Sequence, residues 1–223
     1  MSNELKNVKL HYFPICGRGE PIRMMLEDAG IPYEESNDVA AFFASKMDCD
    51  EYRFNQLPRL EVNGLKLAQQ DAILRYIAAH VGLGPSGKPE EDVVADMLGC
   101  AVEDLMSAYV KNIYSPDATT LLPEFAKTQA PKSFNQYEQL LSKSKSTSGY
   151  FVYDHPSFAE FHLYYTIYAI SHLHPTLLAS YPALEKWFNL MSSRPNLAAY
   201  FKSGRRKEIL NGSPSGQNPC VEA

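Results

Sequence analysis

The eight residues from 82 to 89 constrain the fold more than any other segment, because they contain three glycines and two prolines. A helix cannot continue through such a run, so we interpret it as a linker. The 223 residues are enough for two modest domains. We therefore predict a first domain over 1–81, a linker over 82–89, a second domain over 90–210 and a flexible C-terminal tail over 211–223.

Before the linker, strand and helix patterns alternate in the order β-α-β-α-β-β-α. The pair Asn63-Gly64 can supply the positive φ values of a type I′ turn, which predicts a hairpin over 59–68. Apolar residues recur at helical spacing over 18–29 and 71–81. Further elements are expected as a strand over 9–13, a short strand around Tyr33 and a helix over 39–47. The predicted class of the first domain is α+β.

After the linker, the pattern is helical throughout and predicts an all-α bundle. One long helix is marked by apolar residues between 94 and 109, and others are predicted over 120–144, 157–173, 182–192 and 195–203. The segment Ser157-Phe158-Ala159-Glu160 has the spacing of a capping box. The apolar helix that follows is interrupted by polar residues, which favours a buried helix over a membrane span.

The formal net charge is −5, from 26 acidic and 21 basic residues. This argues against nucleic-acid binding, which needs a basic surface to neutralise phosphates, and any anion must be bound by local donors. Four cysteines, at 16, 49, 100 and 220, show no metal-ligand spacing and no paired motif. We therefore expect free thiols, no metal and a cytoplasmic location.

Four short motifs occur along the chain. They are Tyr-Phe-Pro-x-x-Gly-Arg-Gly-Glu over 12–20, Gln-Leu-Pro over 56–58, Ala-Gln-x-x-Ala-Ile-Leu-Arg-Tyr over 68–76 and Ser-Arg-Pro-Asn-Leu over 193–197. With the linker and the helices, this arrangement resembles the cytosolic glutathione transferases of the tyrosine type, closest to the pi and sigma classes. The resemblance covers nearly the whole chain. It implies a thioredoxin-like glutathione-binding domain, a helical domain that receives hydrophobic electrophiles, and glutathione as co-substrate.

The resemblance implies that Tyr12 is the catalytic residue, with Arg18 as a nearby cation. A free thiol has a pKa of about 8.5, so little of it is ionised near neutrality. A hydroxyl that donates a hydrogen bond to the sulfur stabilises the thiolate and lowers this pKa. Tyrosine, with a pKa of about 10, can donate in this way without losing its own proton.

Further residues are implied to bind glutathione. Pro58 is expected to follow a cis bond, as in the family, so that Leu57 presents its backbone to the tripeptide like an added strand. Gln69 and Gln70 begin the third helix, where free N–H groups and the helix dipole favour the γ-glutamyl carboxylate. The other predicted glutathione contacts are Tyr12, Phe13, Phe43, Lys46, Gln56 and Asp104.

The resemblance also implies a homodimer. Asp104 matches a family aspartate that reaches the glutathione amino group in the neighbouring subunit. Phe54 matches the aromatic key that inserts between helices of the partner. The hydrophobic-substrate site is expected to be lined by Phe13, Ile15, Tyr109 and Tyr114.

Two departures from the family pattern leave alternatives open. The usual Gln-Ser is Gln69-Gln70 here, which predicts weaker glutathione binding because a longer side chain replaces a hydroxyl. Cys16 stands where the family often has arginine, and a thiol near a helix N-terminus suggests a glutathione-dependent thiol oxidoreductase. A weakly catalytic ligand-binding or structural member is the other alternative, and the retention of Tyr12 and Arg18 argues against it.

Overall fold

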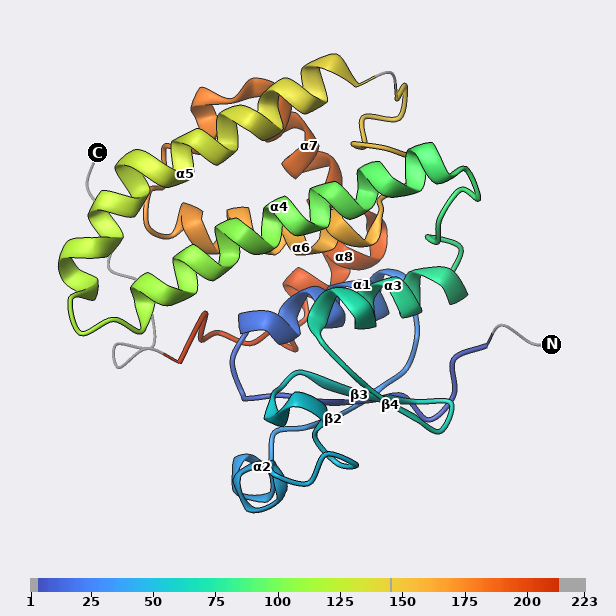
Figure 1. The fold of residues 1–223 in the computed structure, drawn as a ribbon. Coiled ribbons are helices and arrows are strands. Elements are labelled where there is room, and N and C mark those ends of the chain that lie inside the picture. Colours follow the sequence, from blue (N-terminus) through green and yellow to red (C-terminus); the bar gives the residue numbers. More distant parts are fainter. Residues whose placement is uncertain (1–3, 145, 213–223) are drawn as a thin grey trace.

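The computed structural model describes residues 4–144 and 146–212, which form a sheet domain joined to a helical domain (Figure 1). The sheet has the strand order β2-β1-β3-β4, with β1 parallel to β2 and antiparallel to β3, and β3 antiparallel to β4. The strands are β1 (Lys9–His11), β2 (Glu34–Ser36), β3 (Arg59–Val62) and β4 (Leu65–Ala68). The hairpin turn has φ of 52° at Asn63 and 79° at Gly64, so the prediction of positive φ values there is confirmed.

Three helices complete the first domain: α1 (Glu20–Asp28), α2 (Val39–Ser45) and α3 (Gln70–His80). Helices α1 and α3 lie between the sheet and the helical domain, while α2 lies on the other side of the sheet (Figure 1). The predicted order β-α-β-α-β-β-α is confirmed. The first helix differs in one detail, because its predicted start forms a separate 3-10 turn, η1 (Gly17–Gly19). A second such turn, η2 (Arg53–Asn55), was not predicted.

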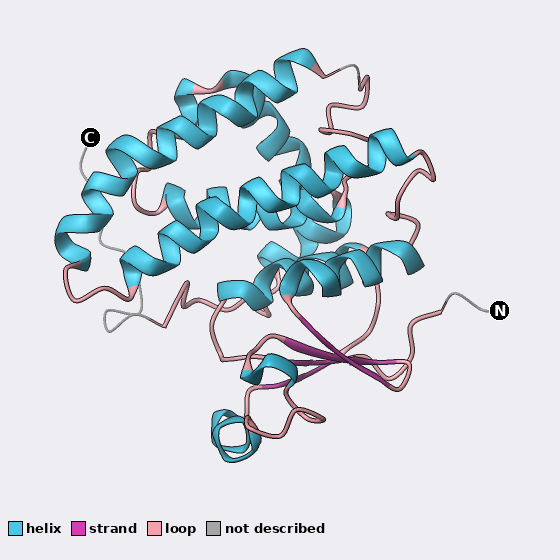
Figure 2. Cartoon of the chain, viewed as in Figure 1, coloured by secondary structure: helices cyan, strands magenta, loops and turns pink. Residues whose placement is uncertain are grey.

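The second domain is entirely helical (Figure 2). Its helices are α4 (Pro89–Ile113), α5 (Ala118–Lys143), α6 (Phe158–Ser171), α7 (Pro182–Ser192) and α8 (Pro195–Lys202), with a 3-10 turn η3 (Leu178–Ser180). All five helices were predicted, within a few residues at most ends; α4 is longer than the apolar pattern alone indicated. Among the described residues, no helix combines the length and the apolar character that a bilayer span requires.

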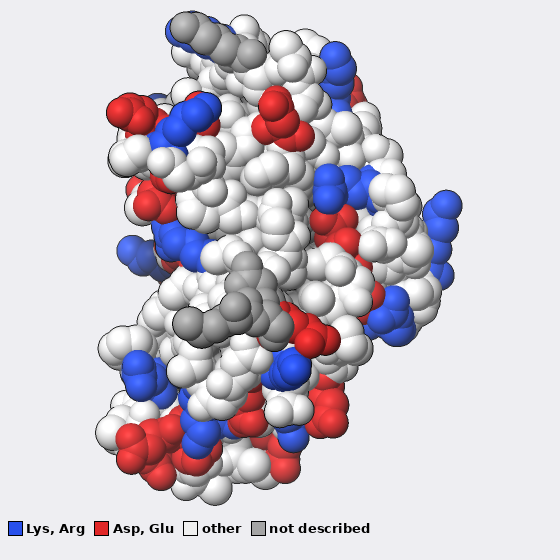
Figure 3. Space-filling model, turned by 90° about the vertical axis from the view of Figure 1, so that its right-hand side faces the viewer, with Lys and Arg blue, Asp and Glu red and all other residues white. Residues whose placement is uncertain are grey.

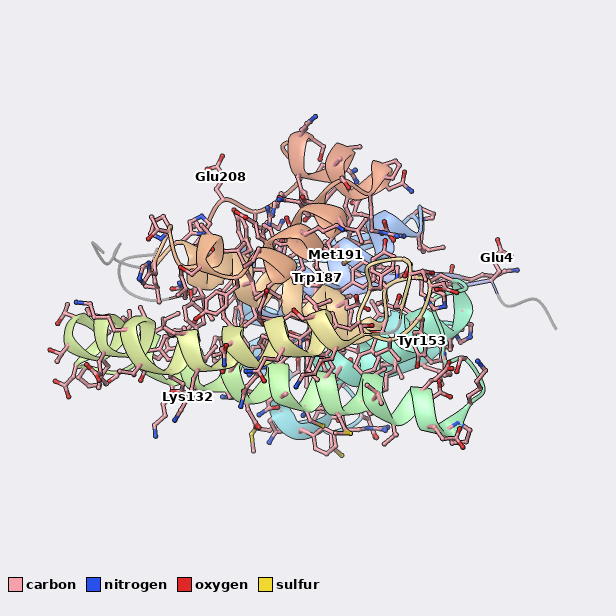
Figure 4. All side chains as sticks on the ribbon, turned by 90° about the horizontal axis from the view of Figure 1, so that it is seen from above. Glu4, Lys132, Tyr153, Trp187, Met191 and Glu208 are labelled. Atoms are coloured by element: carbon pink, nitrogen blue, oxygen red, sulfur yellow. The ribbon has the colours of Figure 1, made fainter. Side chains whose placement is uncertain are left out.

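The buried carboxylate of Glu160 organises the core of the second domain. It accepts hydrogen bonds from the backbone N–H of Ser157 at 2.7 Å, the backbone N–H of Phe151 at 3.1 Å and the indole N–H of Trp187 at 2.9 Å. Trp187 and Met191 lie at the centre of the domain, whereas Lys132 lies at its edge (Figure 4). Glu160, the glutamate of the predicted capping box, thus also holds α7 through Trp187 and the loop before α6 through Phe151.

The segment after α8 returns to the first domain. The backbone N–H groups of Cys16 and Gly17 donate to the carbonyls of Ile209 and Leu210, at 2.7 and 3.0 Å. Leu210 is buried, so the end of the helical domain covers the loop that follows β1. The predicted tail begins here, and its residues from 213 onward lie outside the described part of the chain.

Candidate active site

Tyr12 lies immediately after β1, under a loop that two glycines allow to pack against its ring. Its hydroxyl accepts a hydrogen bond from the backbone N–H of Arg18 at 2.8 Å. A Cβ at Gly17 would lie 2.5 Å from the Tyr12 hydroxyl, and one at Gly19 would lie 2.6 Å from its Cδ1. Gly17 also has a φ of 42°, which side chains disfavour. The Gly-Arg-Gly motif is therefore required by the close approach of the loop to Tyr12.

The surroundings of Tyr12 keep its hydroxyl protonated. Burial raises the pKa of Tyr12 to about 12, although the N–H of Arg18 and nearby positive charge act in the opposite direction. Because the oxygen already accepts the Arg18 N–H, the hydroxyl proton is left to donate to another acceptor.

A cavity of about 700 Å³ lies beside the loop. It is lined by Phe13, Arg18, Phe42, Lys46, Asn55, Gln56, Leu57, Pro58, Gln69, Gln70, Asp71 and Glu103. It therefore brings together most residues predicted to contact glutathione, from four separate segments of the first domain. The Leu57–Pro58 bond is cis, as predicted.

Three predicted glutathione contacts do not line this cavity: Tyr12, Phe43 and Asp104. Phe43 is 57% exposed and does not line the cavity; its ring stacks near the ammonium of Lys46, 5.1 Å from the ring centroid. The preceding residue, Phe42, is buried and faces the cavity instead. On a helix, adjacent residues point about 100° apart, so a one-residue ambiguity in aligning α2 exchanges an inward ring for an outward one.

The N-terminus of α3 forms one wall of the cavity. Gln69 precedes the helix with a φ of 70°, and its side-chain Nε2 donates to the side-chain oxygen Oε1 of Gln56 at 3.2 Å. Gln70 is buried, and its amide Nε2 donates to Asp71 Oδ1 at 3.1 Å, whereas its Oε1 accepts no hydrogen bond from the described residues. The Gln70 amide N–H is thus directed at its neighbour, and it is the helix N-terminus that offers backbone donors to an anion.

Arg18 and Glu103 form a bidentate ion pair across the domain junction. The two guanidinium nitrogens lie 2.5 and 2.7 Å from the Glu103 carboxylate oxygens, and Ser107 donates to the same carboxylate at 2.5 Å. Burial favours the neutral acid, but the contacts with Arg18 and Ser107 hold the pKa of Glu103 below its ordinary value. We did not predict Glu103 or Asp71 as site residues; Glu103 adjoins Asp104 in sequence, but only the structure shows which of the two faces inward.

A second, smaller cavity of about 70 Å³ lies on the other side of Arg18. It is lined by Tyr12, Ile15, Gly17, Arg18, Met106, Tyr109, Val110, Ile113, Tyr114, Tyr165, Leu210 and Asn211. Ile15, Tyr109 and Tyr114, predicted for the hydrophobic site, therefore lie together, whereas Phe13 lines the larger cavity. The hydroxyl of Tyr114 accepts the backbone N–H of Gly212 at 3.0 Å, and Tyr165 donates to the Leu210 carbonyl at 2.9 Å.

Cys16 belongs to the loop between β1 and η1 and is 1% exposed. Its thiol donates to the backbone carbonyl of Lys207 at 3.1 Å. Burial and the neighbouring Glu20 raise the pKa of Cys16 to about 12. A thiol in this environment is neither ionised nor accessible near neutral pH.

The two residues predicted to act on a partner subunit lie on the surface. Asp104 is exposed on α4, one residue from the inward-facing Glu103. Phe54 is 62% exposed and has a φ of 63° within η2. On the face shown in Figure 3, acidic and basic residues are interspersed, so an anion must be attracted by the site itself.

Comparisons with known proteins agree with this architecture. The N-terminal domain model of glutathione S-transferase matches residues 8–79, and the C-terminal domain model matches residues 103–204. The chain is 30% identical over 211 residues to glutathione S-transferase P 2 of Bufo bufo, covering 92% of this chain and 97% of the relative. It is 33% identical over 198 residues to glutathione S-transferase P of Bos taurus, covering 86% and 90%.

A solved pi-class glutathione S-transferase from Onchocerca volvulus superposes with a TM-score of 0.83, at 28% sequence identity, covering 97% of this chain and 100% of that one. The fold is thus that of a two-domain enzyme with a thioredoxin-like first domain. The chain belongs to the glutathione S-transferase family and is of the pi-like type.

Proposed function

We propose that this enzyme ionises the thiol of glutathione by a hydrogen bond from Tyr12 and transfers the thiolate to hydrophobic electrophiles. The observation that carries the proposal is the Tyr12 hydroxyl, which accepts the Arg18 N–H at 2.8 Å and has its own proton left to donate. Tyr12 borders the small apolar cavity, and Arg18, whose backbone N–H bonds the Tyr12 hydroxyl, lines both cavities; this proximity supports the proposal.

Glutathione would occupy the larger cavity. Its γ-glutamyl carboxylate would lie at the N-terminus of α3 near Gln69 and Gln70, and its backbone would pair with Leu57. Lys46 is placed to attract the glycyl carboxylate. A donor aimed at the sulfur stabilises the negative charge in both the thiolate and the transition state. The sulfur would attack the electrophilic carbon, forming an S–C bond, while the leaving group departs with its electron pair.

We further propose that the enzyme is a homodimer in the cytoplasm. Phe54 is a large apolar side chain held out from the surface, which suits insertion into a second copy. The exposed face of α4 carries Val93 and Met97, at 51% and 64% exposure, on the helix that also carries Asp104. The described cysteines are all free, as expected for a reducing compartment.

Glutathione binding, measured by calorimetry, and conjugation to an activated chloroarene would test this function. We expect saturable binding and a product whose formation requires the protein. Binding without conjugation would favour the ligand-binding alternative, and absence of both would overturn the proposal. For the dimer, light scattering is expected to give twice the 25.1 kDa chain mass. A Phe54→Glu variant should dissociate, and a monomeric wild type would contradict the assignment.

The thiol-oxidoreductase alternative is not favoured by any observation. Its nucleophile would be Cys16, which is buried, donates to Lys207 and has a raised pKa. Thiol exchange needs an accessible thiolate.

A further inference from the structure

The wall of the larger cavity carries two carboxylates, Asp71 from α3 and Glu103 from α4, although the proposed ligand is an anion. The guanidinium of Arg18 balances Glu103 through its bidentate ion pair. Within the described residues, Asp71 has one ion-pair partner, His162. An uncompensated carboxylate in this wall would repel the ligand, so the contact between His162 and Asp71 bears directly on binding.

His162 lies on α6 and is completely buried. Its Nδ1 is 2.9 Å from Asp71 Oδ1, and its Nε2 is 3.8 Å from Glu103 Oε2, so one ring spans both carboxylates. Neither ring nitrogen makes a well-aligned hydrogen bond with any described residue. Burying a polar ring without partners is costly, so the two carboxylates at these distances are the groups that compensate it.

Charges on the other helices packed against α6 pair among themselves. Arg75 of α3 lies 2.8 Å from Asp96, and Glu20 and Arg23 of α1 lie 3.3 Å apart. His162 is therefore left to the carboxylates of the cavity wall.

The Asp71 side chain also contacts the residue that begins α3. Burial favours the neutral acid, but the proximity of His162 holds the pKa of Asp71 below its ordinary value. The same carboxylate oxygen accepts the Gln70 amide at 3.1 Å. His162, Asp71 and Gln70 thus connect the core of the helical domain to the helix N-terminus proposed to bind the γ-glutamyl carboxylate.

We propose that His162 is a positioning residue for glutathione: its ring lies between Asp71 and Glu103 and holds both carboxylates in the cavity wall. This inference rests on the proposed function. Its consequence is that loss of the ring lowers the affinity for glutathione, because Asp71 and the Gln70 amide that it accepts are then no longer held at the start of α3.

The test compares His162→Ala, which removes the ring, with wild type. The ligand is S-methylglutathione, whose blocked thiol excludes any contribution from thiol ionisation. We expect roughly tenfold weaker binding by His162→Ala, with little change in kcat at saturating glutathione. In an Asp71→Ala background the same substitution should cost much less, since the carboxylate that the ring holds is gone.

Thr166→Val is the matched control, because Thr166 is buried one turn further along α6 and its hydroxyl donates to the His162 carbonyl at 2.9 Å. It should perturb the helix without changing affinity. Equal losses in both variants, or unchanged binding by His162→Ala, would overturn the inference. If His162→Ala does not fold, ¹⁵N NMR of the wild-type imidazole decides: its ring-nitrogen signals should move on binding S-methylglutathione, and unchanged signals contradict the inference. A wild type that binds no glutathione would instead refute the proposed function.

Discussion

The two cavities beside Tyr12 are built on different principles. The larger one is walled by charged and amide side chains that are already paired with one another, such as Arg18 with Glu103 and Gln70 with Asp71. The smaller one is walled mainly by tyrosines and aliphatic side chains. A network of paired polar groups fixes one arrangement, whereas apolar contacts discriminate weakly between ligands of similar shape. Under the proposed function, the larger cavity would be a specific site for one constant substrate and the smaller one an adaptable site for variable ones.

The largest expected effect is at Tyr12, which borders the smaller cavity next to Arg18. Tyr12→Phe should lower kcat/KM for conjugation by roughly one to three orders of magnitude, because one donor to the developing sulfur charge is lost. The pH midpoint of the reaction should rise toward that of the free thiol, about 8.5. Since the pKa of Tyr12 is raised to about 12, its own ionisation should not enter the wild-type profile between pH 5.5 and 9.

Tyr165→Phe is the control for this prediction. Its hydroxyl borders the smaller cavity but donates to the Leu210 carbonyl, so we expect little change in the pH profile. Equal effects of the two substitutions, measured by steady-state kinetics across the pH range, would show that Tyr12 has no special role.

Arg18→Ala should have the next largest effect and should act mainly on the polar cavity, where its guanidinium pairs with Glu103. Removing the guanidinium leaves Glu103 uncompensated beside an anion, while the backbone N–H that bonds Tyr12 is kept. We expect the KM for glutathione to rise roughly 5- to 20-fold, a modest value because the pair is partly exposed. The double variant Arg18→Ala/Glu103→Gln should recover part of this loss. No recovery would mean that Arg18 contacts the ligand directly rather than by balancing Glu103.

The residues around the two cavities differ in how far the sequence predicts them. Tyr12, Arg18 and Pro58 lie in contiguous motifs, and the alternation of strands and helices before the linker specifies the first domain. Glu103 was missed because it adjoins Asp104, which fits the family pattern, and the sequence match did not separate Phe42 from Phe43. In both cases only helix rotation decides which residue faces inward. Periodicity places a residue on a helix but does not define the partner helix that it faces.

His162 was missed for another reason. In sequence it is a polar interruption of an apolar helix, and its two carboxylate partners are 91 and 59 residues away along the chain. Such a contact depends on how three helices pack, which local patterns do not encode. The C-terminal segment that covers the smaller cavity, ending in the buried Leu210, is likewise fixed by tertiary packing against the loop at Cys16 and Gly17.

A smaller effect is expected at the mouth of the apolar cavity. Tyr114 is 53% exposed, and its hydroxyl accepts the Gly212 N–H. Tyr114→Ala should change the KM for hydrophobic electrophiles roughly three- to tenfold, with the direction depending on substrate size, and leave the KM for glutathione unchanged. Tyr114→Phe, which removes only the hydroxyl, separates the contribution of the ring from that of the Gly212 contact. A change in the glutathione KM would show that the two cavities are not independent.

The smallest effect should be at Cys16, in the loop that follows β1. Replacing it tests whether this loop acts only through its backbone or also through the Cys16 thiol. Burial raises the pKa of Cys16 to about 12, so the folded protein should hold it as an unreactive thiol. Treatment with iodoacetamide at pH 7.5 followed by peptide mass spectrometry should find Cys49 and Cys100, both exposed, alkylated before Cys16. Cys16→Ser should change conjugation by no more than about twofold, since serine can keep the hydrogen bond to the Lys207 carbonyl. Rapid alkylation of Cys16, or loss of activity on its replacement, would mean that the loop opens during turnover and that its thiol takes part in the chemistry.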